Sequence, residues 1–251
     1  MIKVGIIGGS GLEDPRILHD AEEKLIDTPY GLPSSSLISG KIKGTRVMIL
    51  SRHGRSHTIT PSKVNNRANI FSLKKAGCTH IIATTACGSL REEFRRGDLI
   101  VPDQFIDFTR HREVTFFDEF EAGKMKHTPM ADPFDSKMRE LIIRVAADTG
   151  LHVHKKGTII TIEGPRFSTR AESRMFRTWG ADLINMSTSP EAILANELGI
   201  PYSVIAMSTD YDSWKEDEKS VSWEEVLKVF SENVSKVIRL LQETIPLTGR
   251  A

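Results

Sequence analysis

Short runs of β-branched and aliphatic residues alternate with helical patterns along this 251-residue chain. Parallel strands need a crossover between them, usually a helix, so the alternation favours a largely parallel sheet covered by helices. No repeat, low-complexity tract or linker divides the chain. We therefore expect an α/β fold in a single domain over residues 1–251, with a central, largely parallel mixed sheet flanked by helices. The expected strands are Lys3–Ile7, Arg46–Leu50, His80–Thr84, Leu99–Val101, Gly157–Ile162, Asp182–Asn185 and Tyr202–Met207.

Helix signals fall between the expected strands. Residues Asn65–Lys75 form a helical pattern that stops at a glycine turn. Capping-box spacing, in which Ser or Thr is followed three residues later by Glu, occurs at Ser89, Thr169 and Ser222. Residues 108–130 are polar and pattern-free, which predicts a long loop that covers a site.

Charge and cysteine content narrow the functional classes. The formal net charge is +1, which offers no general basis for binding nucleic acid or a membrane. Cys78 and Cys87 lie in apolar stretches without CxxC spacing, so we expect free, buried thiols in a reducing compartment. No apolar run is long enough to span a bilayer, and the N-terminus is no signal peptide. We expect a soluble cytoplasmic protein.

The apolar run that starts at Pro201 ends in two carboxylates, Asp210 and Asp212, one residue apart. Alternate residues of a strand point to the same side, so both carboxylates reach the same space if the strand continues that far. Two acids suit a donor-rich ring such as the edge of an aminopurine, and a protonated carboxyl can donate to a departing base. The alternative is that both acids cap a turn or the next helix.

Polar residues follow every strong strand at its C-terminal end, which in a parallel sheet is the edge where α/β folds bind ligands. Ser10, Arg52, His53, Thr85 and Ser187 combine hydroxyl groups, a guanidinium and the backbone N–H groups of a glycine turn. Such a set predicts an oxyanion or phosphate site. The glycine turn lacks the third glycine of the dinucleotide fingerprint and no P-loop lysine follows, which argues against a nicotinamide enzyme.

Two apolar side chains accompany these polar residues. Phe167 follows a strand end, where an aromatic ring can stack on a flat base, and the thioether of Met186 suits a ribose or a sulfur. Either side chain could equally belong to the core. His53 and His57 have the spacing of a metal pair on a helix, but Gly54 and the missing third ligand argue against it, so we expect no metal site.

Several motifs resemble the 5′-methylthioadenosine phosphorylases of the trimeric purine nucleoside phosphorylase superfamily. In chain order they read GIIGGSGL, SRHGRSHTITPSKVNNRANI, TTACGSL, TIEGPRFSTRAES, WGADLINMS and MSTDYDSW, and they span nearly the whole chain. The resemblance implies a nucleoside phosphorylase/hydrolase-like fold and cleavage of methylthioadenosine by phosphate, giving adenine and 5-methylthioribose 1-phosphate in purine and methionine salvage. It also implies no metal or organic cofactor, and a homotrimer or a dimer of trimers.

The resemblance assigns roles to individual residues of this chain. The phosphate-binding positions fall on Ser10, Arg52, His53, Thr85, Ala86 and Ser187. The substrate-binding positions fall on Met186 at the sugar and on Phe167, Ser168, Asp210 and Asp212 at the base. They also include Val226, Trp223 on the 5′ side, and His127, which a neighbouring subunit lends toward the 5′ side.

The chemistry agrees with these roles. Cleavage of a ribosyl bond passes through an oxocarbenium-like state, as in glycoside hydrolysis, and a bound phosphate stabilises that cation before attacking C1′. The purine leaves more easily when N7 is protonated, a role we assign to Asp210, because burial beside a second carboxylate raises the pKa of such a group. Asp212 is expected to stay ionised and to accept from the 6-amino group.

The sequence departs from the family's pattern at three places. Ser10 and Ser187 stand where relatives often have threonine, and Trp223 stands where many carry a small aliphatic residue on the 5′ side. The sequence also stops at Ala251, before the tail that in relatives reaches the neighbour's 5′ pocket. The base preference is therefore better specified than the 5′ preference.

Other functions stay open from the sequence. A 6-oxopurine nucleoside or methylthioinosine phosphorylase would share the fold, but a 6-oxo ring presents an acceptor at O6 and a donor at N1, which an amide suits better than a second carboxylate. A nucleosidase that uses water would leave the anion site unexplained. A purine-binding module without catalysis would leave both the anion site and the acid unexplained.

Overall fold

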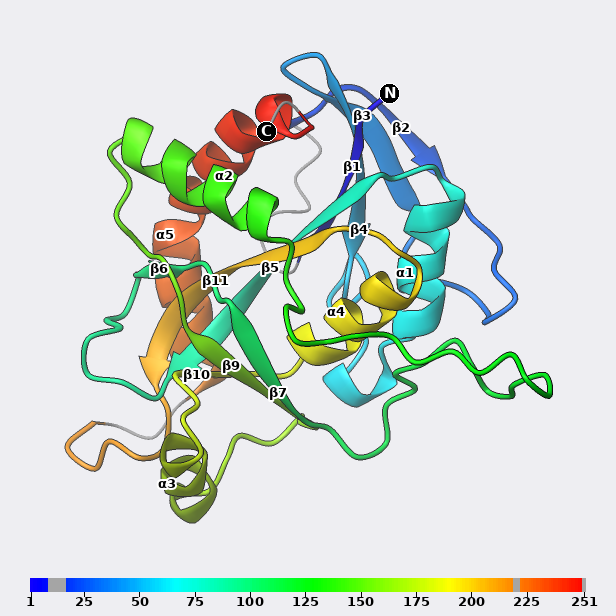
Figure 1. Ribbon diagram of the computed structural model, residues 1–251. Coiled ribbons are helices and arrows are strands. Elements are labelled where there is room, and N and C mark those ends of the chain that lie inside the picture. Colours follow the sequence, from blue (N-terminus) through cyan, green and yellow to red (C-terminus); the bar gives the residue numbers. More distant parts are fainter. Residues whose placement is uncertain (9–16, 219–221, 250–251) are drawn as a thin grey trace.

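The computed structural model describes residues 1–8, 17–218 and 222–249. Its strands form an eleven-stranded mixed sheet with the main order β2-β3-β4-β1-β5-β10-β9-β7, from which β11, β6 and β8 branch at β5 (Figure 1). The strands are β1 (Lys3–Gly8), β2 (His19–Lys24), β3 (Leu37–Ile42), β4 (Thr45–Ser51), β5 (His80–Ser89), β6 (Leu99–Ile100), β7 (Gln104–Phe108), β8 (Val153–His154), β9 (Thr158–Ile162), β10 (Leu183–Asn185) and β11 (Tyr202–Tyr211). The helices are α1 (Asn66–Lys75), α2 (Ser136–Asp148), α3 (Arg170–Thr178), α4 (Thr188–Glu197) and α5 (Trp223–Thr244), with short 3-10 turns η2 (Pro61–Lys63) and η3 (Ile245–Leu247).

The centre of the sheet is parallel. β1 pairs in parallel with β4 and with β5, and β5 pairs in parallel with β11. β9 runs parallel to both β10 and β7. Antiparallel pairs join β2 to β3, β3 to β4, β10 to β5 and β11 to β6. The α/β class and the largely parallel mixed sheet predicted from the sequence are confirmed.

Helices cover both faces of the central strands (Figure 1). α2 and α5 pack together over one face, while α1 and α4 pack together over the other. Side chains of β11 alternate between these two cores: Ile205 and Met207 face α2 and α5, whereas Val204 and Ala206 face α1 and α4. A strand buried on both faces needs apolar residues at successive positions, which explains its continuous apolar run.

Several local predictions are confirmed and one is wrong. Asn65 caps α1, and Thr169 forms a reciprocal capping box with Glu172 at the start of α3. Ser222 caps α5 through the backbone N–H of the third helical residue. The helix predicted after Ser89 is absent, because β5 continues to this residue and its hydroxyl donates to the carbonyl of Arg91 instead.

Three of the strands that were not predicted, β2, β3 and β7, have weak periodic signals. β2 is exposed along almost its whole length and reads HDAEEK, so it has no apolar alternation. β3 contains a glycine and a lysine, and β7 has only partly buried or exposed residues. These strands form because their neighbours offer backbone hydrogen bonds, which the sequence of each strand alone does not indicate.

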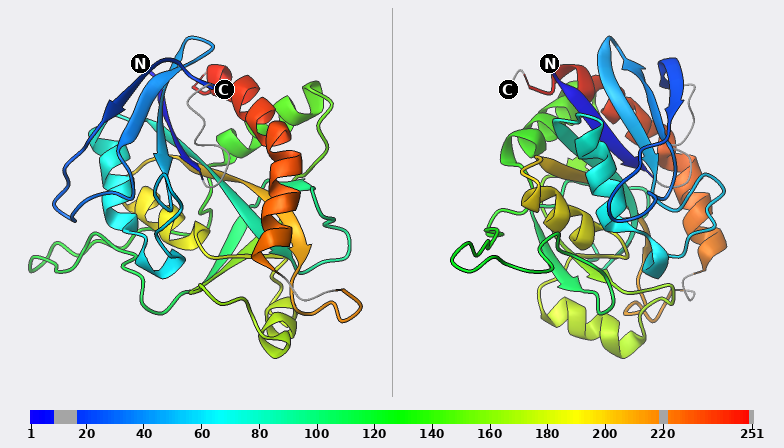
Figure 2. Two further views of the ribbon diagram at one scale, coloured as in Figure 1. Left: turned by 180° about the vertical axis from the view of Figure 1, so that it is seen from behind. Right: turned by 90° about the vertical axis from the view of Figure 1, so that its right-hand side faces the viewer.

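The segment between β7 and α2 extends away from the sheet and its helices (Figure 1, Figure 2). Residues 109–135 contain no helix or strand. The predicted loop over residues 108–130 is therefore confirmed as a loop, except that Phe108 is the last residue of β7. That this loop covers a site stays a prediction.

Two predictions concern the chain as a whole. Cys78 and Cys87 are free and buried, as expected. Across residues 1–8, 17–218 and 222–249, no helix combines the length and the apolar character that crossing a membrane requires.

Candidate active site

A cavity of about 400 Å³ opens where the central parallel strands end. Its size and its largely apolar lining with a few polar groups are typical of a small-molecule site. The lining comes from the ends of β4, β9, β10 and β11, from the second half of β5 and from the first turns of α5. The predicted site residues that line it are Arg52, His53, Thr85, Ala86, Phe167, Ser168, Met186, Ser187, Asp210, Asp212, Trp223 and Val226.

Two predicted site residues are not found in this lining. Ser10 lies outside the described residues. His127 lies in the extended segment before α2, where it is exposed and contacts the ring of Phe120 with 5.7 Å between ring centroids. Its predicted place in a neighbouring subunit's cavity stays a prediction.

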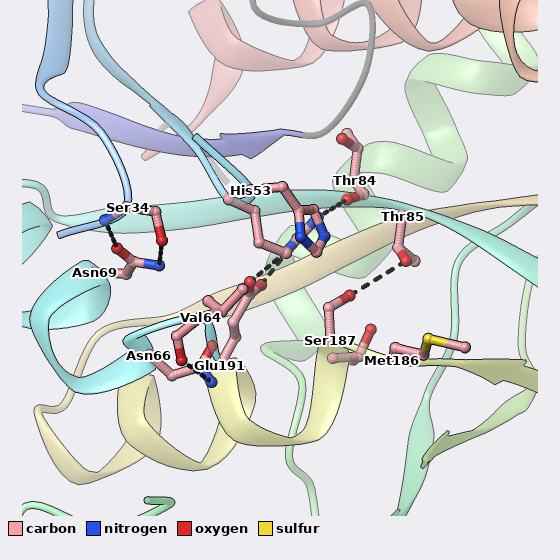
Figure 3. A network of polar contacts seen from close by, with 12 residues as sticks. Ser34, His53, Val64, Asn66, Asn69, Thr84, Thr85, Met186, Ser187 and Glu191 are labelled. Atoms are coloured by element: carbon pink, nitrogen blue, oxygen red, sulfur yellow. Dashed lines mark hydrogen bonds and ion pairs between the residues drawn. The ribbon is translucent and has the colours of Figure 1, made fainter. Parts of the chain in front are cut away.

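The guanidinium of Arg52 is already partnered at the anion end of the cavity. Its Nε and Nη2 donate to the two carboxylate oxygens of Glu191 at 2.5 and 3.1 Å, and Nη1 donates to the carbonyl of Thr84 at 3.0 Å (Figure 3). Both charged side chains are buried, with exposed fractions of 4% for Arg52 and 1% for Glu191. The charge of the Arg52 guanidinium is therefore compensated by the carboxylate of Glu191.

His53 contributes an acceptor to the same end of the cavity. Its Nδ1 lies 2.8 Å from the carbonyl of Ile59 and donates to it. Burial, with a further contribution from the nearby charge of Arg52, lowers the pKa of His53 to about 4. The ring is therefore neutral at pH 7, and its Nε2 carries a lone pair. In the described part of the chain, no group of three or more His, Cys, Asp or Glu could hold a metal ion.

A buried amide organises the hydroxyl groups of the anion end. Nδ2 of Asn185, the last residue of β10, lies 3.1 Å from the hydroxyl of Thr85 and 3.3 Å from that of Ser187. The two hydroxyls are 3.3 Å from each other, and Figure 3 shows them facing one another between β5 and the start of α4. Oδ1 of the same amide accepts from Thr161. Asn185, which itself lines the cavity, thus fixes the positions of both hydroxyls.

A β-bulge in β11 sets the position of the acid pair at the other end. Ser208 pairs with Cys87 and Asp210 pairs with Gly88, so Thr209 is the extra residue. A Cβ atom at Gly88 would lie 3.0 Å from Oδ2 of Asp210. The glycine therefore gives the carboxylate the room it occupies.

Burial raises the pKa of both carboxyl groups. Asp210 is 6% exposed, and its pKa rises to about 6, mainly through burial and further through the charge of Asp212, against a hydrogen bond from Thr209. Burial also raises the pKa of Asp212, while a short hydrogen bond from the hydroxyl of Ser168 favours its charged form. The rise expected for Asp210 from the sequence is confirmed.

Aromatic rings border the remaining side of the cavity. Trp223, the first residue of α5, is 44% exposed, and its ring centroid lies 5.5 Å from that of His57. The ring of His57 in turn lies 4.7 Å from that of His53. Phe167 also lines the cavity and is partly exposed, and Val226 is buried one turn along α5.

A family model and known proteins match nearly the whole chain. A model of the phosphorylase superfamily matches residues 3–246. An S-methyl-5′-thioadenosine phosphorylase of Xenopus tropicalis is 57% identical over 98% of this chain and 88% of its own length. The protein of that name from Drosophila melanogaster is 50% identical over 97% of this chain and 85% of its own. The chain belongs to the 5′-methylthioadenosine phosphorylases.

Solved structures of this phosphorylase family share the fold. A methylthioadenosine phosphorylase from Schistosoma mansoni in complex with adenine has 41% sequence identity and a TM-score of 0.94, over 100% of this chain and 93% of that chain. A variant of the adenosine/methylthioadenosine phosphorylase from the same organism, in complex with methylthioadenosine, has 40% identity and a TM-score of 0.93 over the same shares. The family and the nucleoside phosphorylase-like fold predicted from the sequence are confirmed.

Three polar residues in or beside the cavity were not predicted as site residues. Glu191 and Asn185 are described above. Arg112 donates from Nε to a carboxylate oxygen of Glu163 at 2.8 Å, and its Nη1 lies 3.4 Å from the carbonyl of Met186. Glu191 had a signal, since a lone acid in the otherwise apolar stretch PEAILA of α4 needs a buried partner. Arg112 sits in the pattern-free loop and had none.

The raised pKa of Asp210 predicts a pH-dependent stability difference. The folded chain keeps this proton up to about pH 6, whereas an unfolded aspartate ionises near its ordinary pKa of 3.8. The contribution of the Asp210 carboxyl to the free energy of unfolding is therefore fully present below pH 4. It is lost as the pH rises through 6, a change of about 3 kcal/mol. Asp210→Asn removes the titration, so the unfolding free energy of the variant minus that of the wild type should rise by about that amount between pH 4 and pH 7.

Urea denaturation at several pH values measures this difference. The control is Asp148→Asn, at an exposed position at the end of α2, for which the difference should stay nearly flat. An equally flat difference for Asp210→Asn would contradict the raised pKa.

Proposed function

We propose that the chain cleaves S-methyl-5′-thioadenosine with inorganic phosphate, giving adenine and 5-methylthioribose 1-phosphate. One observation carries the proposal: a single cavity has a buried acid pair at one end and an arginine, histidine and hydroxyl cluster at the other. The family supports it, because relatives at 48–57% identity carry the name of this phosphorylase. The Schistosoma mansoni structures with adenine and with methylthioadenosine support the choice of base and sugar.

In the proposed reaction the bond between C1′ and N9 breaks, and its electron pair leaves with the purine. Phosphate stabilises the cation that develops on the ribose and forms the new bond to C1′. Asp210 donates its proton to N7 of the leaving base, which burial makes possible near neutral pH. Asp212 accepts from the 6-amino group, Phe167 stacks on the ring, and Met186 contacts the ribose.

The proposed phosphate subsite relies on directed hydrogen bonds more than on net charge. Glu191 compensates the charge of Arg52, and His53 is neutral. Nε2 of His53 can accept from a phosphate hydroxyl or from a ribose hydroxyl. Thr85 and Ser187 add hydroxyl donors, and the family pattern adds Ser10 and the backbone at Ala86.

We also propose that the enzyme acts in the cytoplasm as a homotrimer or a dimer of trimers, and that it needs no cofactor, phosphate being a co-substrate. The segment that carries His127 reaches away from its own fold (Figure 2). Phe120 and Met125 on this segment are exposed. Exposed apolar side chains on an extended segment are typical of a surface that contacts another chain.

Base release tests the reaction directly. Methylthioadenosine and methylthioinosine are each incubated with the enzyme, with and without phosphate, and the free base is measured by chromatography. We expect adenine only with phosphate, and little hypoxanthine, because the acid pair suits an amino group. Release without phosphate would indicate a nucleosidase, preference for methylthioinosine would overturn the roles of Asp210 and Asp212, and binding without turnover would indicate a purine-binding module.

The acid role of Asp210 predicts a large loss in one variant. Asp210→Asn should lower kcat/KM for methylthioadenosine by about 10²–10⁴-fold, the usual size of general acid catalysis. At saturating phosphate, kcat/KM of the wild type should fall as the pH rises through about 6, because only the protonated carboxyl donates. The variant should lack this decline, and Asp148→Asn should keep it. Unchanged turnover in Asp210→Asn would remove Asp210 from the mechanism.

The proposed shared pocket predicts recovery of activity in mixtures of two impaired chains. Asp210→Asn and His127→Ala should each reduce turnover. When the two chains are mixed, unfolded and refolded together, some cavities combine an intact Asp210 with a neighbour's intact His127, so activity should partly return. A mixture of Asp210→Asn and Asp212→Asn is the control, because both acids belong to the same chain's cavity. No recovery, with single chains in sedimentation, would contradict the assembly.

A further inference from the structure

The carboxylate of Glu191 is a buried charge that the proposed mechanism does not use. It lies in the first turn of α4, is fully buried, and does not line the cavity. It accepts from Nε and Nη2 of Arg52 on one side, the contact drawn at Glu191 in Figure 3. On the other side it accepts from the hydroxyl of Tyr202 at 2.9 Å. A buried charge costs several kcal/mol unless it is paired, so its partners and geometry determine what it does.

These contacts fix the plane of the Arg52 guanidinium. A guanidinium has five N–H donors in one rigid plane. Glu191 takes one on Nε and one on Nη2, and the carbonyl of Thr84 takes one on Nη1. One donor on each Nη atom has no partner among the described residues. Because the group is planar and rigid, the bidentate contact with Glu191 sets the direction of both remaining donors.

Arg52 lines the same cavity as Thr85 and Ser187. We propose that Glu191 is a positioning residue for the anion subsite: it acts through Arg52 and aims the two remaining guanidinium donors at the bound anion. The identity of that anion as phosphate rests on the proposed function.

A purely compensating role for Glu191 predicts the opposite sign. If Glu191 only neutralised Arg52, removing its charge would leave a positive charge beside the anion, and phosphate would bind as well or better. If Glu191 aims the donors, Glu191→Gln has a different effect. The substitution replaces one carboxylate oxygen by an NH2 group, so this donor faces an N–H donor of Arg52. The guanidinium then tilts, and phosphate binds more weakly.

Two variants separate these roles. Glu191→Gln removes the charge and nearly keeps the size, while Glu191→Asp keeps the charge and shortens the side chain by one methylene. Each should raise the phosphate concentration for half-saturation about tenfold, the size of one lost charge-assisted hydrogen bond. The KM for methylthioadenosine should change much less. Phosphate half-saturation equal to or below that of the wild type in either folded variant would overturn the proposal.

The matched control is Tyr202→Phe. It removes the third hydrogen bond to the same carboxylate, and Tyr202 does not line the cavity. This variant should unfold at a lower temperature but keep the phosphate half-saturation of the wild type. If Tyr202→Phe also raised the phosphate half-saturation tenfold, loss of packing around Glu191 would explain the weaker binding, and the proposed orienting role would be wrong.

Inorganic phosphate alone gives a second readout that needs no turnover. Its effect on the unfolding temperature of the wild type and of each Glu191 variant measures binding directly. A wild type that phosphate stabilises but that releases no adenine would overturn the proposed function, while weaker stabilisation of the variants would still support the role of Glu191. A wild type that phosphate does not stabilise would overturn the anion subsite and this role together.

Discussion

The parallel pairing of β5 with β11 fixes the position of one end of the cavity relative to the other. Thr85 of β5 pairs with Ala206, and three residues further along β5 Gly88 pairs with Asp210, so the anion end and the acid pair are fixed along one ladder. A slip of one residue would turn every side chain of β11 to the opposite face. Burial on both faces opposes such a slip, because each face of β11 packs against its own pair of helices.

The same burial explains how much of the fold could be predicted. β1, β4, β5 and β11 read as apolar runs because helices cover both of their faces, and all were located from the sequence. β2 could not be located, since an exposed edge strand has no need of apolar residues. The prediction of a helix at Ser89 was wrong because the pairing of β5 with β11 continues to Ser89 and Tyr211. Strand pairing outweighed the local capping signal.

Several side chains that line the cavity were predicted, while Glu191 and Asn185, which hold some of them in place, were not. A side chain at a strand end, such as Arg52 or Asp210, has a position that topology alone restricts to one edge of the sheet. Glu191 lies 139 residues from Arg52 in the chain, and no local pattern connects the two. Asn185 acts as a hub only because β5, β9 and the start of α4 meet around it. Such contacts depend on packing, which the sequence of a single element does not contain.

The two ends of the cavity meet the cost of buried charge in opposite ways. At the anion end Arg52 stays charged, and a carboxylate of matching geometry compensates it, so orientation is retained without net charge. At the base end Asp210 has no ion pair with a described residue, and burial outweighs the distant charge of Arg96 and shifts the equilibrium toward the protonated form. The first arrangement gives fixed donors for an anion, and the second gives a movable proton. If the two arrangements were exchanged, neither end could keep its function. A carboxylate paired with a cation at the base end would stay ionised and carry no proton near pH 7. An unpaired guanidinium, whose proton is not lost in proteins, would have no such means of relief.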